Sequence, residues 1–245
     1  MNTALILAAG VGQRMRNSGL PKQFLKLFGK PILIYTLERF EQSPDIEDVV
    51  MVCRDGYVDF VGKLLKDYRI RKVSRLVVGG SSRQESIRKG LEAIRENGGK
   101  DEDIVVIHDG VRPMVSPRTL RENIRRAREH GCAITVRSAT ESIVITDSEA
   151  AGIDDFKKRR STYFLTSPQS FFLGSLWKAY EAAAAESGTY GDMPLLDAGM
   201  VYAAYGGKAY LVKEQNKNIK ITTPEDFYYL KAMIELEENK SIFGI

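Results

Sequence analysis

The chain has 245 residues, of which 43% are hydrophobic and 28% are charged, a composition that predicts one folded domain and excludes a disordered chain. No apolar run approaches the roughly 18 residues of a membrane span, and the first residues resemble a strand rather than a signal peptide, so a cytoplasmic protein is expected. The formal net charge of +4 is too small to indicate a nucleic-acid-binding protein.

The first half of the chain alternates short apolar runs with amphipathic stretches. The apolar runs predict strands at residues 4–7, 49–53, 75–78 and 104–107. The amphipathic stretches predict helices at residues 32–41, 57–65, 86–95 and 119–130, the last with Ser116 as its cap and Pro117 in its first turn. This alternation is typical of an α/β protein with a mostly parallel, doubly wound sheet.

Residues 133–161 interrupt the alternation with β-rich, less regular sequence, which predicts an excursion from the core. The segment Thr-Ser-Pro-Gln at residues 166–169 predicts a turn. Helices are expected near residues 175–185, 195–204 and 224–236, with a strand at 209–212. A chain of this length can form one large α/β domain or two small ones, and residues 1–245 are interpreted as a single domain. The sequence has no internal repeat.

A glycine-rich segment, Leu-Ala-Ala-Gly-Val-Gly-Gln-Arg-Met at residues 7–15, follows the first predicted strand. Gly10 and Gly12 allow backbone N–H groups to turn toward an anion, and Arg14 adds a guanidinium suited to phosphate oxygens. Met15 stands where a dinucleotide-binding fingerprint requires a third glycine, and the Gly-Lys-Ser/Thr of a P-loop is absent. The segment is interpreted as a triphosphate loop, with a glycine turn that binds nothing as the alternative.

A second cation follows the glycine-rich segment closely. Lys22, in Pro-Lys-Gln-Phe, comes eight residues after Arg14 and could neutralise the charge that builds on a pyrophosphate leaving group. The alternative for Lys22 is a solvated surface lysine. The two isolated thiols, Cys53 and Cys132, lie in apolar segments and are expected to be buried rather than to bind zinc or form a disulfide.

Another polar segment, His-Asp-Gly-Val-Arg-Pro at residues 108–113, ends a predicted strand. Open α/β sheets bind ligands at the carboxyl ends of their strands, so Gly10 and Asp109 are expected to converge on one crevice. Asp109 is the candidate Mg²⁺ ligand, because this ion prefers one or two carboxylates together with phosphate oxygens. A side chain that only caps the following turn is the alternative for Asp109. His108 is expected to pack against the sheet rather than to act as a base.

The segment Gly-Gly-Ser-Ser-Arg-Gln-Glu-Ser at residues 79–86 also follows a predicted strand and opens a helix. Free N–H groups at such a position can bind an anion or the edge of a base. Gly80 and Ser86 are therefore candidates to contact a nucleobase or ribose. A glycine-serine turn without a ligand is the alternative.

Six segments, in order along nearly the whole chain, resemble the family of small cytidylyltransferases. They are residues 7–15, 21–24, 79–86, 108–113, Ser-Pro-Gln-Ser-Phe at 167–171 and Asn-Ile-Lys-Ile-Thr at 218–222. The family contains the 2-C-methyl-D-erythritol 4-phosphate enzyme of isoprenoid synthesis and the D-ribitol-5-phosphate enzyme of teichoic-acid and capsule synthesis. The resemblance implies a Rossmann-like nucleotidyltransferase fold, in which residues 133–161 form a protruding β-arm that clasps a second subunit in a homodimer.

The resemblance also implies a role for each matching position. The catalytic cations would be Arg14, Lys22 and Lys220, and Asp109 would hold Mg²⁺. CTP would be bound by Ala8, Ala9, Gly10, Gly12, Gly80, Ser81, Ser86 and Gly110. The polyol-phosphate acceptor would be bound by Arg112, Glu141, Ser142, Arg159 and Asp197, with Arg159 reaching the partner's site from the arm.

The chain departs from the family pattern at two places that concern the acceptor. Glu141 and Ser142 stand where the arm usually carries Asp-Thr, and Leu196 precedes Asp197 where a threonine is frequent. Val111, Ser170 and Thr222 favour D-ribitol 5-phosphate as the acceptor, which would yield CDP-ribitol, and 2-C-methyl-D-erythritol 4-phosphate is the alternative.

Two other classes of protein share part of this pattern. A dinucleotide-dependent oxidoreductase shares the strand–glycine–helix opening, but Met15 argues against it. A catalytically silent nucleotide-binding module shares most of the motifs, but Asp109 and Lys22 argue against it. In the expected reaction a phosphate oxygen of the acceptor attacks the α-phosphorus of CTP, and no general base is needed because a phosphate nucleophile is already ionised near neutral pH.

Overall fold

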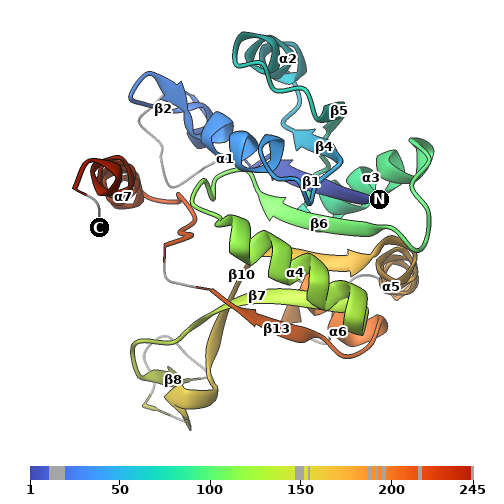
Figure 1. Cartoon of the computed structure of the whole chain (residues 1–245). Coiled ribbons are helices and arrows are strands. Elements are labelled where there is room, and N and C mark those ends of the chain that lie inside the picture. Colours follow the sequence, from blue (N-terminus) through green and yellow to red (C-terminus); the bar gives the residue numbers. More distant parts are fainter. Residues whose placement is uncertain are drawn as a thin grey trace.

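A seven-stranded sheet runs through the centre of the molecule (Figure 1). The computed structural model describes residues 1–10, 20–146, 152–153, 155–186, 189–190, 193–194, 197–214 and 217–243. The strand order is β13 (Tyr210–Lys213), β7 (Cys132–Ser138), β10 (Tyr163–Phe172), β6 (Ile104–Asp109), β1 (Asn2–Ala8), β4 (Asp48–Cys53) and β5 (Val73–Val78). In this sheet β10 is antiparallel to both of its neighbours, and the other strand pairs are parallel. The predicted α/β class with a mostly parallel sheet is confirmed.

Helices cover both faces of the sheet, because successive residues of its strands point to opposite sides. Ala4, Ile6 and Ala8 of β1 belong to one core cluster, and Leu5 belongs to the other. The first cluster includes residues of α1 (Ile32–Glu41), α2 (Val58–Asp67) and α4 (Pro117–His130). The second includes residues of α3 (Arg83–Glu96), α5 (Leu173–Ala185) and α6 (Ala198–Tyr205). The sheet is therefore doubly wound, as predicted.

Capping serine side chains mark the starts of α3 and α4. Ser116 Oγ accepts from the backbone N–H of Thr119, and Pro117 opens α4, as predicted. Ser82 Oγ accepts from the N–H of Glu85, so α3 begins at Arg83, three residues earlier than predicted. The thiols of Cys53 and Cys132 are buried and form no disulfide, as predicted.

The turn predicted at residues 166–169 is wrong. These residues lie inside β10, where the pairing with β7 shifts register between Leu165 and Gln169 and the Ser167–Pro168 peptide is cis. Proline within a sheet is confined mainly to edges and irregular positions, so the turn-like composition marks an irregular strand rather than its end.

The predicted excursion is shorter than expected. Residues 133–138 belong to β7 of the central sheet, so the arm begins after Ser138. In the arm, β8 (Ile143–Ile145) pairs with β9 (Asp155–Lys157), followed by the 3₁₀ turn η3 (Arg159–Ser161). The arm projects away from the sheet at the foot of Figure 1, and Phe156 on it is 67% exposed.

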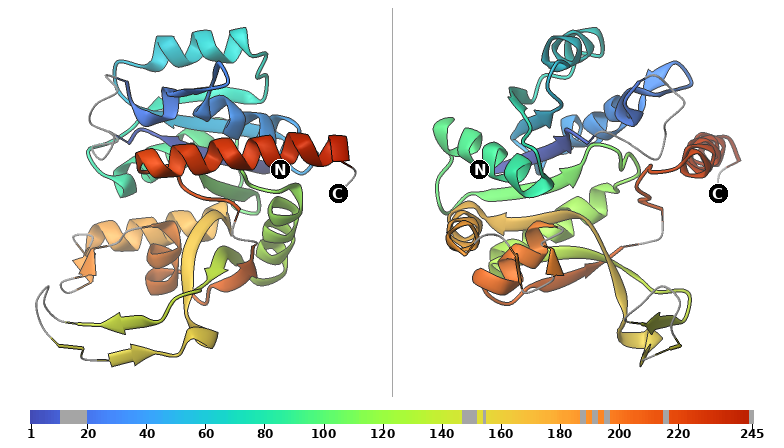
Figure 2. Two further views of the ribbon diagram at one scale, coloured as in Figure 1. Left: turned by 90° about the vertical axis from the view of Figure 1, so that its left-hand side faces the viewer. Right: turned by 180° about the vertical axis from the view of Figure 1, so that it is seen from behind.

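The last helix, α7 (Pro224–Phe243), is longer than predicted and lies across one side of the molecule (Figure 2). Leu230 and Ile234 of α7 pack with Leu27 and Ile32, next to the short strands β2 (Lys26–Leu27) and β3 (Lys30–Pro31). The remaining short elements are η2 (Lys22–Phe24), β11 (Thr189–Tyr190) and β12 (Met193–Pro194). In the part of the chain that the structure describes, no helix combines the length and the apolar character that a membrane span requires.

The glycines at positions 62 and 90 provide a matched test of this packing. A Cβ at Gly90 of α3 would lie 2.4 Å from a methyl group of Leu5, whereas a Cβ at Gly62 of α2 would have no atom within 4 Å. Gly90→Ala should therefore lower the free energy of unfolding by about 1–3 kcal/mol through overpacking. Gly62→Ala should raise it by about 0.5–1 kcal/mol through better helix propensity. Urea unfolding of both variants measures these changes, and equal effects would contradict the close contact of α3 with the sheet.

Candidate active site

A cavity of about 260 Å³ lies at the carboxyl ends of β1 and β6. Its walls bring together the start of the glycine-rich segment, the 80–86 segment, Asp109 and two lysines. The lining residues are Leu7, Ala8, Ala9, Gly10, Lys22, Gln23, Gly80, Ser81, Ser82, Arg83, Ser86, Asp109, Val111 and Lys220. Gly10 and Asp109 therefore line the same cavity, as predicted from their positions after β1 and at the end of β6. Gly12, Arg14 and Met15 lie outside the described residues.

The glycine-rich segment is held in place by a buried amide. Gln23 is 1% exposed, and its Nε2 donates to the carbonyl oxygens of Ala8, at 2.7 Å, and of Gly10, at 3.3 Å. This bond fixes the end of β1 to the 3₁₀ turn that carries Lys22. Sequence reasoning assigned no role to Gln23, and its only signal was its place in the Pro-Lys-Gln-Phe segment.

The second loop approaches the first closely. A Cβ at Gly79 would lie 2.5 Å from the Cβ of Ala9, so only glycine allows this approach. Ser86 Oγ accepts from the N–H of Gly80 at 3.0 Å and donates to the carbonyl of Ser82 at 2.8 Å. Ser86 therefore stabilises the loop through bonds within the protein, and both Ser86 and Gly80 line the cavity.

Hydrogen bonds within the same loop engage Ser81. Its N–H and its hydroxyl both donate to the Glu85 carboxylate at 2.7 Å. These bonds, together with Lys89, lower the pKa of Glu85 to about 2, so its carboxylate remains ionised and accepts both bonds from Ser81 even in mildly acidic solution.

One buried carboxylate in the cavity wall contacts three cations. Asp109 is 5% exposed, and its Oδ1 lies 2.8 Å from Arg83 Nη1. Its Oδ2 lies 3.1 Å from Arg112 Nε and 3.2 Å from Lys220 Nζ. Burial alone would raise the pKa of Asp109, but the three cations outweigh it and hold this pKa well below the usual range. Sequence reasoning did not single out Arg83, although it lies in the 79–86 segment.

The cluster around Asp109 bears on the predicted metal site. Both oxygens of the Asp109 carboxylate form ion pairs with the cationic side chains around it, Arg83, Arg112 and Lys220. Among the described residues, no three His, Cys, Asp or Glu side chains form a group that could hold a metal ion. A single carboxylate fits Mg²⁺ when phosphate oxygens of a nucleotide complete the ligand set. The donor set therefore suits an ion that arrives with a triphosphate rather than one that is resident in the protein.

His108 is a packed strand-end residue, as expected. It is fully buried, its Nε2 donates to the carbonyl of Arg112 at 3.0 Å, and its Nδ1 lies 3.1 Å from Ser167 Oγ. Burial is the main cause that lowers the pKa of His108 to about 4. The imidazole is therefore neutral at pH 7 and helps to position the 108–113 segment.

Three of the residues predicted from sequence to form the site do not line the cavity in the part of the chain that the structure describes. They are Gly110, Arg112 and Asp197, and each makes a contact within the protein. Gly110 donates its N–H to the carbonyl of Leu7 at 2.8 Å. Arg112 is anchored by a bond from Nη1 to the carbonyl of Asn218 at 2.7 Å. Asp197 caps α6 and accepts from the N–H of Met200 at 3.0 Å.

The three predicted arm residues are exposed and are not brought to the cavity of their own chain. Glu141, Ser142 and Arg159 lie on the arm, which follows the carboxyl end of β7 and projects beyond the sheet (Figures 1 and 2). None of the three lines the cavity.

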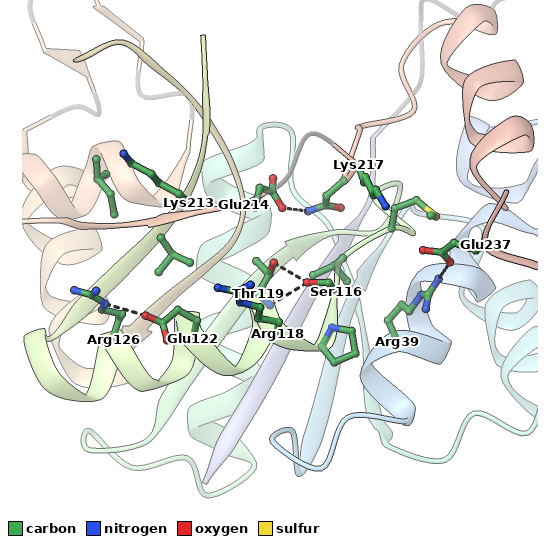
Figure 3. A pocket seen from close by; sticks show the side chains of 16 residues that line it. Arg39, Ser116, Arg118, Thr119, Glu122, Arg126, Lys213, Glu214, Lys217 and Glu237 are labelled. Atoms are coloured by element: carbon green, nitrogen blue, oxygen red, sulfur yellow. Dashed lines mark hydrogen bonds and ion pairs between the residues drawn. The ribbon is translucent and has the colours of Figure 1, made fainter. Parts of the chain in front are cut away.

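A second cavity, of about 860 Å³, lies between α4, β13 and α7 (Figure 3). Ion pairs across its wall join Arg39 to Glu237 and Arg126 to Glu122, each at 3.0 Å. Its wall includes Asn218, whose carbonyl accepts the bond from Arg112. The second cavity therefore adjoins the Asp109 cluster through this bond but contains none of the sequence-predicted site residues.

Comparison with known proteins gives a consistent result. A family model described as 2-C-methyl-D-erythritol 4-phosphate cytidylyltransferase (IspD) matches residues 2–236. A ribitol-5-phosphate cytidylyltransferase of Vibrio parahaemolyticus is 40% identical over 244 residues and covers 100% of both chains. A 2-C-methyl-D-erythritol 4-phosphate cytidylyltransferase of Clostridium novyi is 34% identical over 238 residues, 96% of each chain. The solved 4-diphosphocytidyl-2C-methyl-D-erythritol synthase of Anaerococcus prevotii is similar with a TM-score of 0.80, at 25% identity over 96% of each chain.

The burial of His108 predicts its titration. In a His130→Gln variant His108 is the only histidine, because the chain has two. Its imidazole proton signals should titrate with a midpoint of about 4. The pKa of this histidine is about 6.5 in the unfolded chain. Between about pH 6.5 and the lowered value, the unfolded chain binds a proton at His108 and the folded chain does not, so the free energy of unfolding decreases as the pH falls. NMR titration measures the midpoint, and a value above 6 would contradict a buried, neutral His108.

Proposed function

The chain belongs to the IspD family and is a cytidylyltransferase, and we propose that it transfers CMP from CTP to D-ribitol 5-phosphate. The products are then CDP-ribitol and pyrophosphate. The observation that carries the proposal for the donor is the cavity whose wall contains Lys22, Arg83 and Lys220 and the buried carboxylate of Asp109. Two of these cations, Arg83 and Lys220, contact that carboxylate. This excess of positive charge suits a polyanion such as a triphosphate.

The choice of acceptor rests on the relatives. The Vibrio parahaemolyticus relative, which this chain matches over its full length at 40% identity, is named for ribitol 5-phosphate. A relative of Streptococcus agalactiae with the same name is 36% identical over 245 residues. The alternative acceptor, 2-C-methyl-D-erythritol 4-phosphate, is supported by the family model and by the Clostridium novyi relative at 34%.

In the proposed reaction, a phosphate oxygen of the acceptor attacks the α-phosphorus of CTP and the bond to pyrophosphate breaks. Catalysis of such a transfer needs positioning and neutralisation of charge rather than a covalent intermediate. Lys22 and Lys220 are proposed to stabilise the charge on the reacting phosphates, and the glycine-rich segment is proposed to bind the triphosphate through its N–H groups. Arg14 is proposed as a further cation of the same segment. His108 takes no part as a base, because its ring nitrogens are engaged within the protein.

The remaining proposed roles concern the nucleotide, the acceptor and the metal. For CTP we propose Ala8, Ala9, Gly10, Gly12, Gly80, Ser81, Ser86 and Gly110, and for the acceptor Arg112, Glu141, Ser142, Arg159 and Asp197. Asp109 would hold Mg²⁺ together with the phosphates of CTP, and the ion would neutralise charge on the triphosphate when bound. Because CTP is a metabolite of the cell interior, we place the reaction in the cytoplasm.

We further propose that the enzyme is a homodimer in which each arm completes the partner's site. Support comes from the exposure of Glu141, Ser142 and Arg159 on the arm and from large apolar side chains there, such as Ile145 and Phe156. Exposed apolar surface on a projecting element is typical of a protein interface.

The identity of the acceptor can be tested directly. Purified protein with CTP and Mg²⁺ should release pyrophosphate on addition of D-ribitol 5-phosphate, and ATP in place of CTP should not support this release. The same assay with 2-C-methyl-D-erythritol 4-phosphate serves as the comparison. Turnover with the erythritol phosphate alone would reject the ribitol assignment, and pyrophosphate release from neither acceptor would reject both.

Subunit complementation tests Lys22 and the arm together. Lys22→Ala should lower kcat by about 100-fold or more, because it removes a cation that stabilises the transition state. Lys26→Ala, four residues away and exposed, is the matched control and should retain normal kcat. Arg159→Ala should also impair turnover, through the proposed contact with the acceptor.

Mixing the Lys22→Ala and Arg159→Ala proteins should restore up to about one quarter of the wild-type rate. In a two-fold symmetric dimer with crossing arms, each mixed dimer has one site that carries neither change. A mixture no more active than its components, or a light-scattering mass equal to the 27.4 kDa of one chain, would contradict the crossed arms.

A further inference from the structure

The ion-pair cluster around Asp109 is unbalanced in charge. One carboxylate contacts three cations, so these four groups carry a net charge of about +2, with Asp109 and Arg112 shielded from water and Arg83 and Lys220 partly exposed. The like charges of Arg83, Arg112 and Lys220 repel one another, and Asp109 is the carboxylate that contacts them. Asp197 also acts on Arg83, and Glu214 on Arg112, through longer-range attraction. The cluster is therefore electrostatically prepared for an anion that is not part of the protein.

The three cations differ in how firmly they are held. Arg112 is 12% exposed and also donates to the carbonyl of Asn218 at 2.7 Å, which anchors its guanidinium behind Asp109. The side chains of Arg83 and Lys220 are 32% and 38% exposed, and both line the cavity. Arg83 and Lys220 can thus turn toward a ligand by side-chain rotation, whereas Arg112 is fixed.

The two oxygens of Asp109 are covered by different partners. Oδ2 contacts both Arg112 and Lys220, so it keeps a cation even if Lys220 moves. Oδ1 is bonded to Arg83, at 2.8 Å. Rotation of Arg83 alone would therefore expose one carboxylate oxygen to the cavity, and a single carboxylate oxygen with phosphate oxygens is the ligand set that Mg²⁺ accepts.

We propose that Arg83 is a nucleotide-binding residue that covers Asp109 Oδ1 in the free enzyme and turns onto the phosphates of CTP, so that a divalent cation binds Asp109 only together with the nucleotide. This inference rests on the proposed function, because it takes the triphosphate of CTP as the arriving anion. A guanidinium can donate two parallel N–H bonds to phosphate oxygens. Arg83 would thus replace its single contact with the Asp109 carboxylate by a pair of charged hydrogen bonds. The free enzyme is thereby protected from binding a metal ion without its nucleotide.

Arg83→Gln tests the covering role with Mn²⁺ as the probe and no nucleotide present. Free Mn²⁺ is followed by electron paramagnetic resonance as protein is added. The variant should bind Mn²⁺ at least about tenfold more tightly than the wild type, because the repulsion of one adjacent cation is removed. Arg88→Gln is the matched control, since Arg88 is exposed on the same helix and pairs with Glu92.

Two further variants separate this effect from a change at another surface site. Addition of Asp109→Asn to Arg83→Gln should abolish the gain in Mn²⁺ affinity. Arg83→Lys keeps the charge and should bind Mn²⁺ no better than the wild type. A Mn²⁺ affinity of Arg83→Gln equal to that of Arg88→Gln, or a gain that survives Asp109→Asn, would overturn the inference.

The phosphate contact is tested by calorimetric titration with CTP in the presence of a chelator. Arg83→Gln should bind CTP about tenfold more weakly than the wild type, and Arg83→Lys should also bind more weakly because it lacks the planar fork. The lysine variant keeps the test decisive if the glutamine variant does not fold. Unchanged CTP affinity in Arg83→Lys and Arg83→Gln would reject the role of Arg83.

These results can be distinguished from a failure of the proposed function. If the wild type binds CTP but no acceptor releases pyrophosphate, the assignment of the reaction fails while the binding results for Arg83 stand. If turnover with ribitol 5-phosphate is normal and Arg83→Gln gains no Mn²⁺ site, only the inference about Arg83 fails.

Discussion

The candidate site depends on one buried carboxylate. Asp109 ends the central strand β6 and draws together cations from three separate parts of the chain, at residues 83, 112 and 220. Loss of this carboxylate would leave partly buried cations without compensation, which is costly in a shielded environment. The same interaction that stabilises the folded site therefore also concentrates the positive charge that a triphosphate requires.

The sheet determines where this carboxylate lies. β1 and β6 are parallel neighbours, so the glycine-rich segment and the 108–113 segment leave the sheet at the same edge. β10 returns antiparallel beside β6 and brings Ser167 Oγ to within 3.2 Å of the Asp109 backbone nitrogen. His108 joins this contact, so the backbone around the carboxylate is held from two sides by buried polar groups.

Much of the fold could be predicted from sequence because buried strands and capped helices leave local patterns. β1, β4 and β6 are continuous apolar runs, and Ser116 with Pro117 marks the start of α4. The polar segments that end β1 and β6 also indicated which residues would meet. Strand β10 was not predicted, because Ser167 and Pro168 have the composition of a turn and only pairing with distant strands shows that they belong to a sheet.

Gln23 and Arg83 were missed for a different reason: each acts through a contact with a residue that is remote in sequence and unrelated in type. The Gln23 amide donates to a backbone carbonyl, and since every residue has such a carbonyl, the partner leaves no mark in the sequence. The contact of Arg83 with Asp109 depends on the rotamer of a long side chain, which the sequence does not specify. The arm residues Glu141 and Arg159 illustrate a third limit. The family resemblance, and not a local pattern, implied that they bind the acceptor, and neither of them lines the cavity of its own chain.

The bonds from Gln23 have a consequence for how enzymes of this type can diverge. Because one amide joins the end of β1 to the turn that carries Lys22, the two halves of the donor site form one mechanical unit. A substitution that displaces the end of β1 should also displace Lys22, and the reverse, so a single change in either segment affects both. The arm and the start of α6 are not tied to this unit by such a bond among the described residues. If the arm binds the acceptor as proposed, its residues can change without displacing the segments proposed to bind CTP.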